Sequence, residues 1–456
     1  MSVATDLPRT GSRPSDRRPV APARWAATAI AAAVLGLAVT LGLAVSAESA
    51  GSLSAPGGIE TFLGRLAGLL AAYAMLMVVL LIARVPALER AVGQDRLVRW
   101  HRRLGPWPLY LLPAHAVLIT LGYARQGGRG FLAEIGTLLW TYPGVLAATA
   151  ASILLVMAGV SSYRRARRRL AYETWWTVHL YTYLALGLAF SHQVSTGASF
   201  FGHPLARLWW TSLWLGAAAL VLVHRVAAPL RRSLRHRLRV EEVRQEGPGV
   251  ISVILRGKDL ERLPMRGGQF FQWRFLVRGM WWQAHPYSLS ALPRPPYLRL
   301  TVKDLGDHSG WLARVGPGTR VAIEGPYGTF TRPAEQAPGV ALIGAGVGMT
   351  PLLALLEDLP AHADVAVISR ASTEHELVLR DELSRLVRKR RGRLHELVGT
   401  RSEVDLGAHA LLRLIPDLAR REVYVCGPDG FAAGVSAAAR RSGTPARSIH
   451  CETFAF

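Results

Sequence analysis

Four histidines in the first half of the chain form two pairs with nearly equal spacing. His101 and His115 are 14 residues apart, and His179 and His192 are 13 residues apart. Each spacing corresponds to about 20 Å along a helix. If the two segments are parallel helices, His101 lies level with His179, and His115 with His192. Two neutral imidazoles ligate the iron of an electron-transferring haem, so the spacing predicts two haems b stacked across a bilayer.

The simpler interpretation is that these histidines are hydrogen-bonded packing residues within a membrane. Two pairs at matched depths favour ligation of iron. The 13-residue spacing is awkward, because at about 100° per residue 14 positions return to nearly the same helix face and 13 do not. We therefore expect the second helix to be distorted, for example near Gly187, or its histidines to approach the two haems from different directions.

Arg65 is the only charged residue in the second apolar stretch of the chain, near its outer end. A charge inside a membrane needs a partner and is a candidate functional residue. The propionates of the outer haem would supply that partner. The alternative is that Arg65 extends to the outer headgroups.

These residues must be positioned by membrane-spanning helices. Each of six apolar runs is long enough to cross a hydrocarbon core of about 30 Å. They cover residues 25–46, 61–83, 104–123, 143–162, 174–193 and 208–228. The sequence therefore predicts a six-helix all-α transmembrane bundle over 25–228. The Arg-, Pro- and Ser-rich segment 1–24 is predicted to be a disordered basic tail.

The net charge of the chain is +23, with 54 Lys and Arg against 31 Asp and Glu. Of these bases, 22 fall in four segments on one side of the predicted bundle, whereas the opposite loops hold Arg125, Arg129 and Arg207. Positive charge marks the cytoplasmic side. We expect a multi-pass plasma (inner) membrane protein with both termini in the cytoplasm, and no nucleic-acid partner. The two cysteines are too few for a disulfide scaffold or a Cys-ligated iron–sulfur cluster.

The second half has the composition of a soluble protein. Residues 236–333 contain short strands separated by Gly and Pro, which predicts a small antiparallel β-barrel. From 338 to 456 strands alternate with helical stretches, which predicts an α/β domain with a parallel sheet.

The predicted barrel contains the run His285-Pro286-Tyr287-Ser288-Leu289-Ser290. An aromatic face suits a flat ring, and a hydroxyl can hydrogen-bond a ring nitrogen. The run resembles the flavin motif of the ferredoxin–NADP reductase superfamily, in the form found in NADPH oxidases and ferric-chelate reductases. The resemblance implies that Tyr287 lies against the isoalloxazine ring of FAD and that Ser288 bonds its N5. His285 stands where other relatives have a phosphate-binding Arg, and Pro286 completes the motif.

Further motifs support the same resemblance. Lys303 and Ser309 fall in a segment similar to the family's second FAD segment, which meets the pyrophosphate. A glycine-rich turn then follows a strand and opens a helix, with the sequence Gly344-Ala345-Gly346-Val347-Gly348-Met349-Thr350-Pro351. Its backbone and helix N-terminus suit a dinucleotide pyrophosphate. Arg370 stands where the family binds the 2′-phosphate, which favours NADPH, although NADH is possible.

Two features near the C-terminus complete the resemblance. Cys426-Gly427-Pro428 is similar to the family's turn whose Cys lies near the nicotinamide. Relatives end on an aromatic stacked on the flavin, as Phe456 would be. A buried inert thiol and a frayed terminus are the alternatives.

The resemblance to the ferric reductase and NADPH oxidase family extends from about residue 55 to the end. It implies an NAD(P)H-dependent enzyme in which electrons pass through FAD and two haems to an extracytoplasmic acceptor. Oxygen, giving superoxide, and a ferric chelate both remain open as acceptors; Arg65 slightly favours oxygen. An acceptor or regulatory protein is also possible. The alternative function is a membrane-anchored flavoprotein that reduces a cytosolic or periplasmic partner.

Overall fold

A computed structural model describes residues 22–454, apart from 168, 171, 198–199, 201–202, 305 and 332–338. The chain divides into two compact units, Met1–Leu215 and Gly216–Phe456. Residues 1–21 of the predicted basic tail lie outside the described residues.

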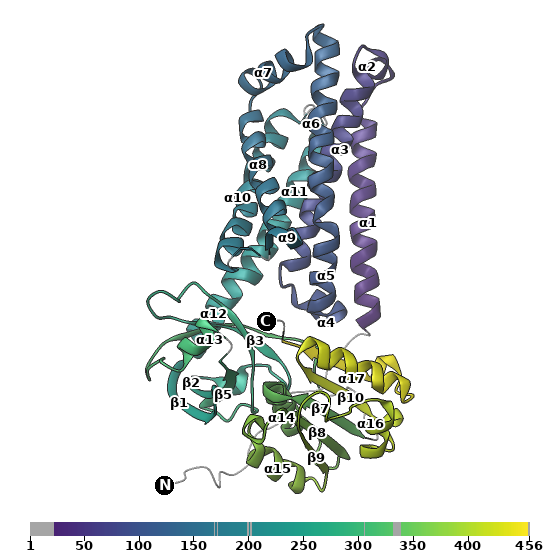
Figure 1. The fold of residues 1–456 in the computed structure, drawn as a ribbon. Coiled ribbons are helices and arrows are strands. Elements are labelled where there is room, and N and C mark those ends of the chain that lie inside the picture. Colours follow the sequence, from purple (N-terminus) through teal and green to yellow (C-terminus); the bar gives the residue numbers. More distant parts are fainter. Residues whose placement is uncertain are drawn as a thin grey trace. The chain divides into compact units, whose positions relative to one another are not determined.

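The first unit is helical, and its long helices run side by side (Figure 1). The helices are α1 (Pro22–Ser46), α2 (Ala50–Ser54), α3 (Gly58–Ile82), α4 (Pro86–Val92), α5 (Gln94–Leu104), α6 (Pro106–Gly127), α7 (Phe131–Thr141), α8 (Val145–Ser162), α9 (Arg164–Arg167), α10 (Tyr172–Thr196) and α11 (Pro204–Val221).

Five helical segments in the described part of the chain are long and apolar enough to cross a membrane. They are Ala26–Ser46, Gly58–Ile82, Arg96–Gly127, Val145–Ser162 and Pro204–His236. The expected fifth span corresponds to α10, which has 25 residues but does not join this set. Its sequence includes His179, His192, Gln193 and several hydroxyl side chains, which lower its hydropathy. The count of six spans is therefore not confirmed.

The histidine helices differ from expectation in where they are interrupted. The segment with His101 and His115 consists of two helices, because α5 ends at Leu104 and Pro106 begins α6. Proline is favoured at a first helical position and cannot continue a preceding helix. In contrast, α10 is α-helical from Tyr172 to Thr196. Within these described residues the predicted distortion near Gly187 is absent, so the 13-residue spacing places His179 and His192 on different faces.

The second unit begins within α11, at Gly216, and continues with a π-helical turn, Leu222–Ala227, followed by α12 (Ala228–His236). Pro229 explains the widened turn. It has no N–H to donate, and its ring crowds the carbonyl of the residue four positions earlier, Arg225. The turn lets Arg225 donate to Glu324 of β6 at 3.1 Å.

Six antiparallel strands follow, arranged as two three-stranded sheets with the orders β1-β2-β5 and β4-β3-β6. The strands are β1 (Arg239–Gly247), β2 (Val250–Arg256), β3 (Phe270–Phe275), β4 (His285–Ser288), β5 (Tyr297–Lys303) and β6 (Val321–Tyr327), with the short helix α13 (Asp307–Leu312) before β6. Alternate residues of β3, namely Phe271, Trp273 and Phe275, point into the shared core. The described strands form no closed sheet, so the antiparallel strands are confirmed but the predicted barrel is not; the two sheets bury their apolar faces in one core.

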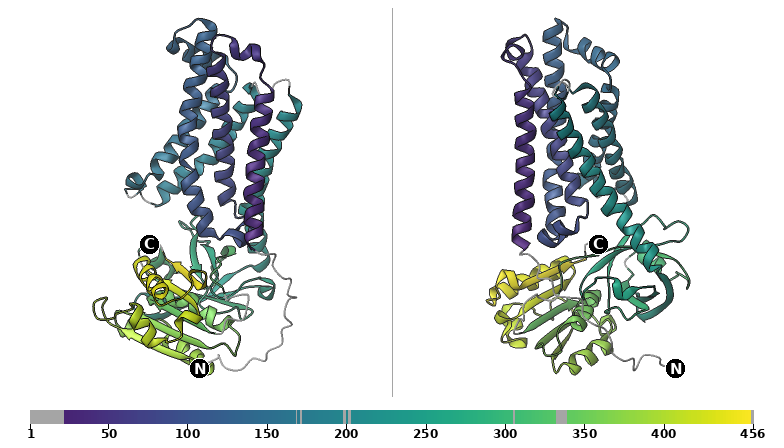
Figure 2. Two further views of the ribbon diagram at one scale, coloured as in Figure 1. Left: turned by 90° about the vertical axis from the view of Figure 1, so that its right-hand side faces the viewer. Right: turned by 180° about the vertical axis from the view of Figure 1, so that it is seen from behind.

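The last part of the chain contains a five-stranded parallel sheet in the order β11-β10-β7-β8-β9. Its elements are β7 (Val340–Ala345), α14 (Met349–Asp358), β8 (Val365–Ala371), α15 (Arg380–Lys389), β9 (Arg393–Val398), α16 (Ala408–Leu414), β10 (Glu422–Gly427), α17 (Asp429–Arg441) and β11 (Ile449–Thr453). The helices α14 and α15 cover one face, and α16 and α17 cover the other (Figures 1 and 2). Every residue of β7 is buried, as expected for a central parallel strand.

Candidate functional site

The backbone of α3 holds two of the four histidines. The Nδ1 atom of His101 lies 2.9 Å from the carbonyl of Val78, and that of His115 lies 2.8 Å from the carbonyl of Gly64. Gly64 and Val78 are 14 residues apart, the same spacing as the two histidines. Because the two spacings match, a single helix fixes both imidazoles.

These hydrogen bonds determine the tautomer of each ring. A carbonyl oxygen only accepts, so Nδ1 of His101 and of His115 must carry the proton. The lone pair is then on Nε2, the atom left for a metal. Metal-ligating histidines commonly donate their other ring N–H to a backbone carbonyl in this way.

His179 of α10 is held by α8. Its Nδ1 lies 3.5 Å from Oγ of Ser162, whose hydroxyl donates to the carbonyl of Ala158 at 2.7 Å. The hydroxyl proton is thus engaged, and Ser162 accepts from His179. Ser162 also accepts from the indole N–H of Trp175, whose ring stacks on His179 with centroids 5.2 Å apart.

His192 is oriented from within its own helix. Oγ1 of Thr196 donates to the His192 carbonyl at 2.7 Å and therefore accepts from Nδ1 of the ring at 2.9 Å. All four histidines thus have Nδ1 as donor and the lone pair on Nε2. The sequence contained no specific signal for these partners, since all four acceptors are ordinary hydroxyls or peptide carbonyls of kinds that many residues carry.

The structure brings His101 and His179 close together, as their depths predicted. Their rings have centroids 6.1 Å apart and planes at 68°. Two imidazoles on opposite sides of one metal, with bonds of roughly 2 Å, have centroids roughly 6 Å apart. His101 and His179 therefore fit a bis-imidazole site, and the pairing of His115 with His192 stays a prediction. Among the described residues there is no cluster of three or more His, Cys, Asp or Glu side chains that could hold a metal ion.

Gly68 of α3 makes room for the His115 ring. A Cβ at this position would lie 2.7 Å from Nδ1 and 2.9 Å from Cε1 of His115. We expect Gly68→Ala to push the ring off the Gly64 carbonyl and to weaken haem binding at His115 by about 10–100-fold, the usual cost of losing an orienting partner. The haem content of the purified protein measures this. Gly42→Ala is the matched control, because a Cβ there meets nothing within 4 Å; equal haem content in both variants would contradict the assignment.

Arg65 has a different partner from the one predicted. Its guanidinium lies 2.5 Å from Oε1 of Glu48, in the turn between α1 and α2, and Ser52 donates to the same carboxylate. Three other arginines in this unit are also paired: Arg84 with Glu89 at 3.1 Å, Arg125 with Glu60, and Arg129 with Glu134 at 3.4 Å. Glu48 thus offsets part of the charge of Arg65, and the contact of Arg65 with a haem propionate stays a prediction.

The flavin-like motif forms β4 and its continuation. β4 pairs with β3, and the indole of Trp273 donates to the carbonyl of Tyr287. Burial raises the pKa of Tyr287, so this side chain stays neutral. The Ser288 hydroxyl is buried, and no described residue hydrogen-bonds it. Such an orphan group needs a partner, and a flavin ring nitrogen would fit it. His285 stacks on Tyr287 at 6.3 Å, and Pro286 is exposed.

Ser290, the last residue of this motif, is linked through Arg299 to the α/β part of the unit. Arg299 donates to its hydroxyl and carbonyl and forms a bidentate ion pair with Glu382 of α15, at 2.7 and 3.0 Å. Sequence reasoning missed this connection, because Arg299 and Glu382 are 83 positions apart.

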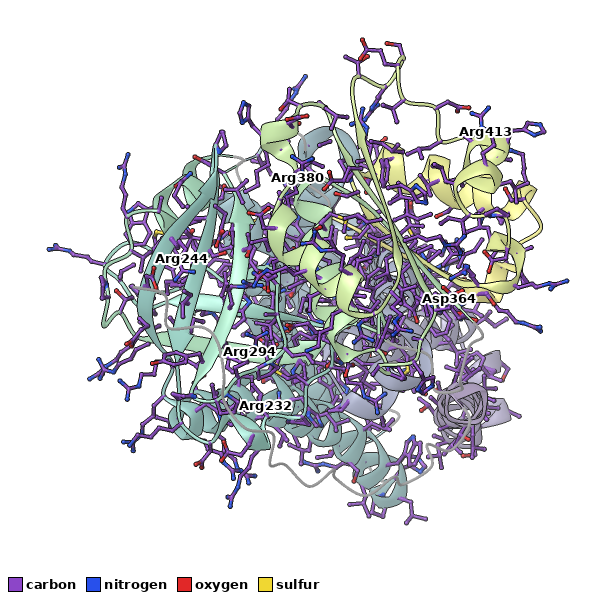
Figure 3. All side chains as sticks on the ribbon, turned by 90° about the horizontal axis from the view of Figure 1, so that it is seen from below. Arg232, Arg244, Arg294, Asp364, Arg380 and Arg413 are labelled. Carbon is purple, nitrogen blue, oxygen red and sulfur yellow. The ribbon has the colours of Figure 1, made fainter. Side chains whose placement is uncertain are left out.

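The segment that resembles the family's second FAD segment also contacts the α/β part of the unit. Lys303 lies 3.1 Å from Glu376, and this contact lowers the pKa of that carboxyl. The predicted contact of Lys303 with a phosphate therefore competes with the ion pair between Lys303 and Glu376. The Ser309 hydroxyl bonds Asp304 and the Gly306 carbonyl. Arg294, labelled in Figure 3, makes a further pair with Glu357 at 2.7 Å.

The glycine-rich turn and the cysteine turn meet at the ends of β7 and β10. Cys426 is opposite Gly344 in the sheet, and a Cβ on Gly348 would collide with the Cys426 carbonyl. Gly346 has φ +53° and open space beside it, so the backbone there is accessible. The Thr350 hydroxyl donates to the Val347 carbonyl. The two motifs thus form one backbone-lined cradle. Pro351 and Gly427 are buried parts of its walls, and Pro428 precedes α17.

The remaining predicted residues lie nearby or outside the described part. Cys426 is fully buried, and burial raises its thiol pKa, so it is a neutral thiol. Arg370, at the end of β8, donates to the carbonyl of Gly399 at 2.9 Å and lies 3.4 Å from the Ser372 hydroxyl. Phe456 lies outside the described residues, whereas Phe454 packs against the core of the parallel sheet.

Comparison with known proteins identifies two segments. Residues 67–190 match the family described as the ferric reductase like transmembrane component, and residues 342–437 match the oxidoreductase NAD-binding domain. The first segment includes His101, His115 and His179 and ends two residues before His192, and the second includes the cradle.

Individual relatives resemble part of the chain. A flavohemoprotein of Deinococcus radiodurans is 31% identical over 41% of this chain and 51% of its own length. An NADPH oxidoreductase of Mycobacterium tuberculosis is 27% identical over 50% of this chain and 63% of its own length. The FAD/NAD-binding domain of a Vibrio cholerae nitric oxide dioxygenase superposes with a TM-score of 0.42 and 25% identity, over 48% of this chain and 99% of that domain. The chain spans about half to two thirds of the curated relatives' length.

Proposed function

This chain joins a ferric reductase-like transmembrane component to an oxidoreductase NAD-binding domain, and we propose that it is an NAD(P)H-dependent oxidoreductase that conducts electrons across the plasma membrane. Cytoplasmic NAD(P)H is the donor, and both termini lie in the cytoplasm, as the distribution of arginines indicates. The observation that carries the proposal is the state of the four histidines, each with Nδ1 as donor and Nε2 left for iron.

The first unit would hold two haems b. His101 and His179 would hold the inner haem, and His115 and His192 would hold the outer haem. The carbonyls of α3 keep His101 and His115 in the ligating tautomer, and Trp175 limits rotation of His179. Rings fixed in advance need little rearrangement when the iron changes charge.

The second unit would hold FAD and the nucleotide. FAD would supply the chemistry that links hydride transfer from NAD(P)H to transfer of single electrons. Ser288 would hydrogen-bond the flavin ring, and Tyr287 would cover one face of it. The cradle of Gly344, Gly346 and Gly348 would receive the pyrophosphate, with Cys426 excluding water beside the nicotinamide. Arg370 favours NADPH over NADH, because a guanidinium matches a phosphate.

The electron acceptor lies outside the cytoplasm and is oxygen or a ferric chelate. A sealed vesicle preparation with the second unit exposed distinguishes these acceptors. Superoxide-dismutase-sensitive reduction of enclosed cytochrome c by added NADPH indicates oxygen, and reduction of enclosed ferric citrate alone indicates a metal reductase. Flavin reduction with neither product, together with an oxidised haem spectrum, would reject the conduit and favour a flavoprotein that reduces a partner protein.

A further inference from the structure

One face of the helix that begins the second unit stays apolar and exposed to its end. Leu222, Val226, Leu230 and Leu234 recur every fourth residue, and 60, 51, 56 and 63% of their surfaces are accessible. Residues at this spacing form one stripe along a helix. The stripe lies in the C-terminal half of the apolar segment Pro204–His236.

The contacts that the other face of α12 makes explain why this stripe is left uncovered. Pro229 and His236 are buried, and Ser233 bonds the N–H of Ile323 in β6 at 3.0 Å. These three residues face the sheet. The sheet therefore does not cover Leu230 and Leu234. Exposing these side chains to water would cost free energy.

A second exposed apolar group lies in the loop between β3 and β4, residues 276–284. Trp281 is 62% exposed and Leu276 is 45% exposed, and Arg278 lies between them. Backbone hydrogen bonds from Met280 and Trp281 to the Val277 carbonyl close this loop into a compact turn. The Trp281 ring is thus held outward by a structured loop.

The loop and α12 belong to the same edge of one sheet. Ile323, which contacts Ser233 of α12, is opposite Trp273 in β3. Leu276 comes three residues after Trp273 and bonds the Arg320 carbonyl at 2.9 Å. Three residues of strand span about 10 Å, so the loop begins about 10 Å from the helix contact.

Both elements carry arginines next to their apolar residues. On α12 these are Arg231, Arg232 (labelled in Figure 3) and Arg235, and in the loop Arg278. Arg231 and Arg235 are exposed. A combination of exposed Trp and Leu with arginines is typical of elements at a membrane–water interface.

We propose that this surface, formed by Leu230, Leu234, Leu276, Trp281 and the arginines beside them, rests on the anionic inner leaflet of the bilayer. Continuity of the stripe with the apolar helix favours lipid over a protein partner, and the positive charges match phosphatidylserine headgroups. The interaction fixes the second unit against the membrane through lipid. It does not depend on haem binding or on the proposed electron transfer.

Fluorescence from a label on the loop tests this interaction in the full-length protein. A Trp281→Cys, Cys451→Ser variant is labelled with an environment-sensitive dye, which leaves the buried Cys426 unreacted. It is placed in nanodiscs that contain phosphatidylserine and a spin-labelled lipid quencher. We expect about twofold quenching. The control is a label at Tyr297→Cys on β5, an exposed aromatic position outside this surface.

Substitution of the arginines provides a second test of the proposal. Replacing Arg231, Arg235 and Arg278 by Gln should abolish the difference between nanodiscs with and without phosphatidylserine. A label at Leu276→Cys repeats the test if the Trp281 variant folds poorly. Equal quenching at positions 276 and 297, or none at either loop position in a protein with a native circular dichroism spectrum, would overturn the proposal.

Discussion

His115→Leu is expected to lower electron delivery to the extracytoplasmic acceptor by at least about 100-fold and to remove half of the bound haem. Leucine has no lone pair, so the outer pair keeps only His192, and loss of an orienting group alone already costs 10–100-fold in metal affinity. The second unit does not contain this residue, so reduction of flavin by NADPH should be unchanged. The haem-to-flavin ratio and single-turnover absorbance at the flavin and haem bands measure both effects.

The control for this variant is His203→Leu, at an exposed position preceding α11. It loses an imidazole outside both pairs, and we expect the full haem content and the wild-type rate. If His115→Leu also keeps both haems and its outward activity, the outer pair is a packing feature and the conduit is wrong.

Gly348→Ala is expected to slow reduction of flavin by NADPH by about 100-fold. The added Cβ would collide with the Cys426 carbonyl and lie 2.9 Å from the Gly427 nitrogen. Both contacts are backbone, so the turn must move, and a displacement of about 1 Å at a reacting site costs about 100-fold. Dithionite should still reduce the haems fully, because the first unit is unaltered. Stopped-flow absorbance with each reductant separates the two reactions.

Gly434→Ala in α17 is the matched control, since a Cβ there meets nothing within 4 Å. It should retain the wild-type rate and gain about 0.5–1 kcal/mol in stability, the usual difference between Ala and Gly within a helix. A wild-type rate in Gly348→Ala would show that the glycine cradle does not receive the nucleotide.

Sequence patterns were informative where a function requires rare residues at fixed spacings. His101 and His179 meet because depth along a helix follows from residue number, and this inference needed no knowledge of side-chain packing. The glycine-rich turn and the Cys426 turn were each recognised by their motif, whereas their meeting at the ends of β7 and β10 was not predicted.

The partners of these residues were less predictable. The carbonyls of Gly64 and Val78 could not be recognised, since every residue carries a carbonyl and only the packing of α3 on α5 and α6 selects these two. Glu48 was equally hidden: pairing it with Arg65 depends on the conformation of a turn. Lys303 was assigned to a phosphate because the motif suggested it, whereas its contact with Glu376 comes from a distant segment.

Two features of the fold also depended on more than local pattern. Alternation of apolar residues specifies which face of a strand is buried, but it does not decide whether the sheet closes, and six strands here bury the same faces as two open sheets. In the first unit, the histidines and hydroxyls that give α10 a candidate function also make it more polar, and α10 is not among the described helices that are long and apolar enough to cross a membrane.

The most direct test of the account is an anaerobic reduced-minus-oxidised spectrum of the full-length protein after addition of NADPH. The account predicts that flavin absorbance falls first and that the absorption bands of two reduced low-spin haems then appear, to the same amplitude as with dithionite. Loss of flavin absorbance without any haem band, in a protein whose haems dithionite does reduce, would contradict electron transfer between the two units.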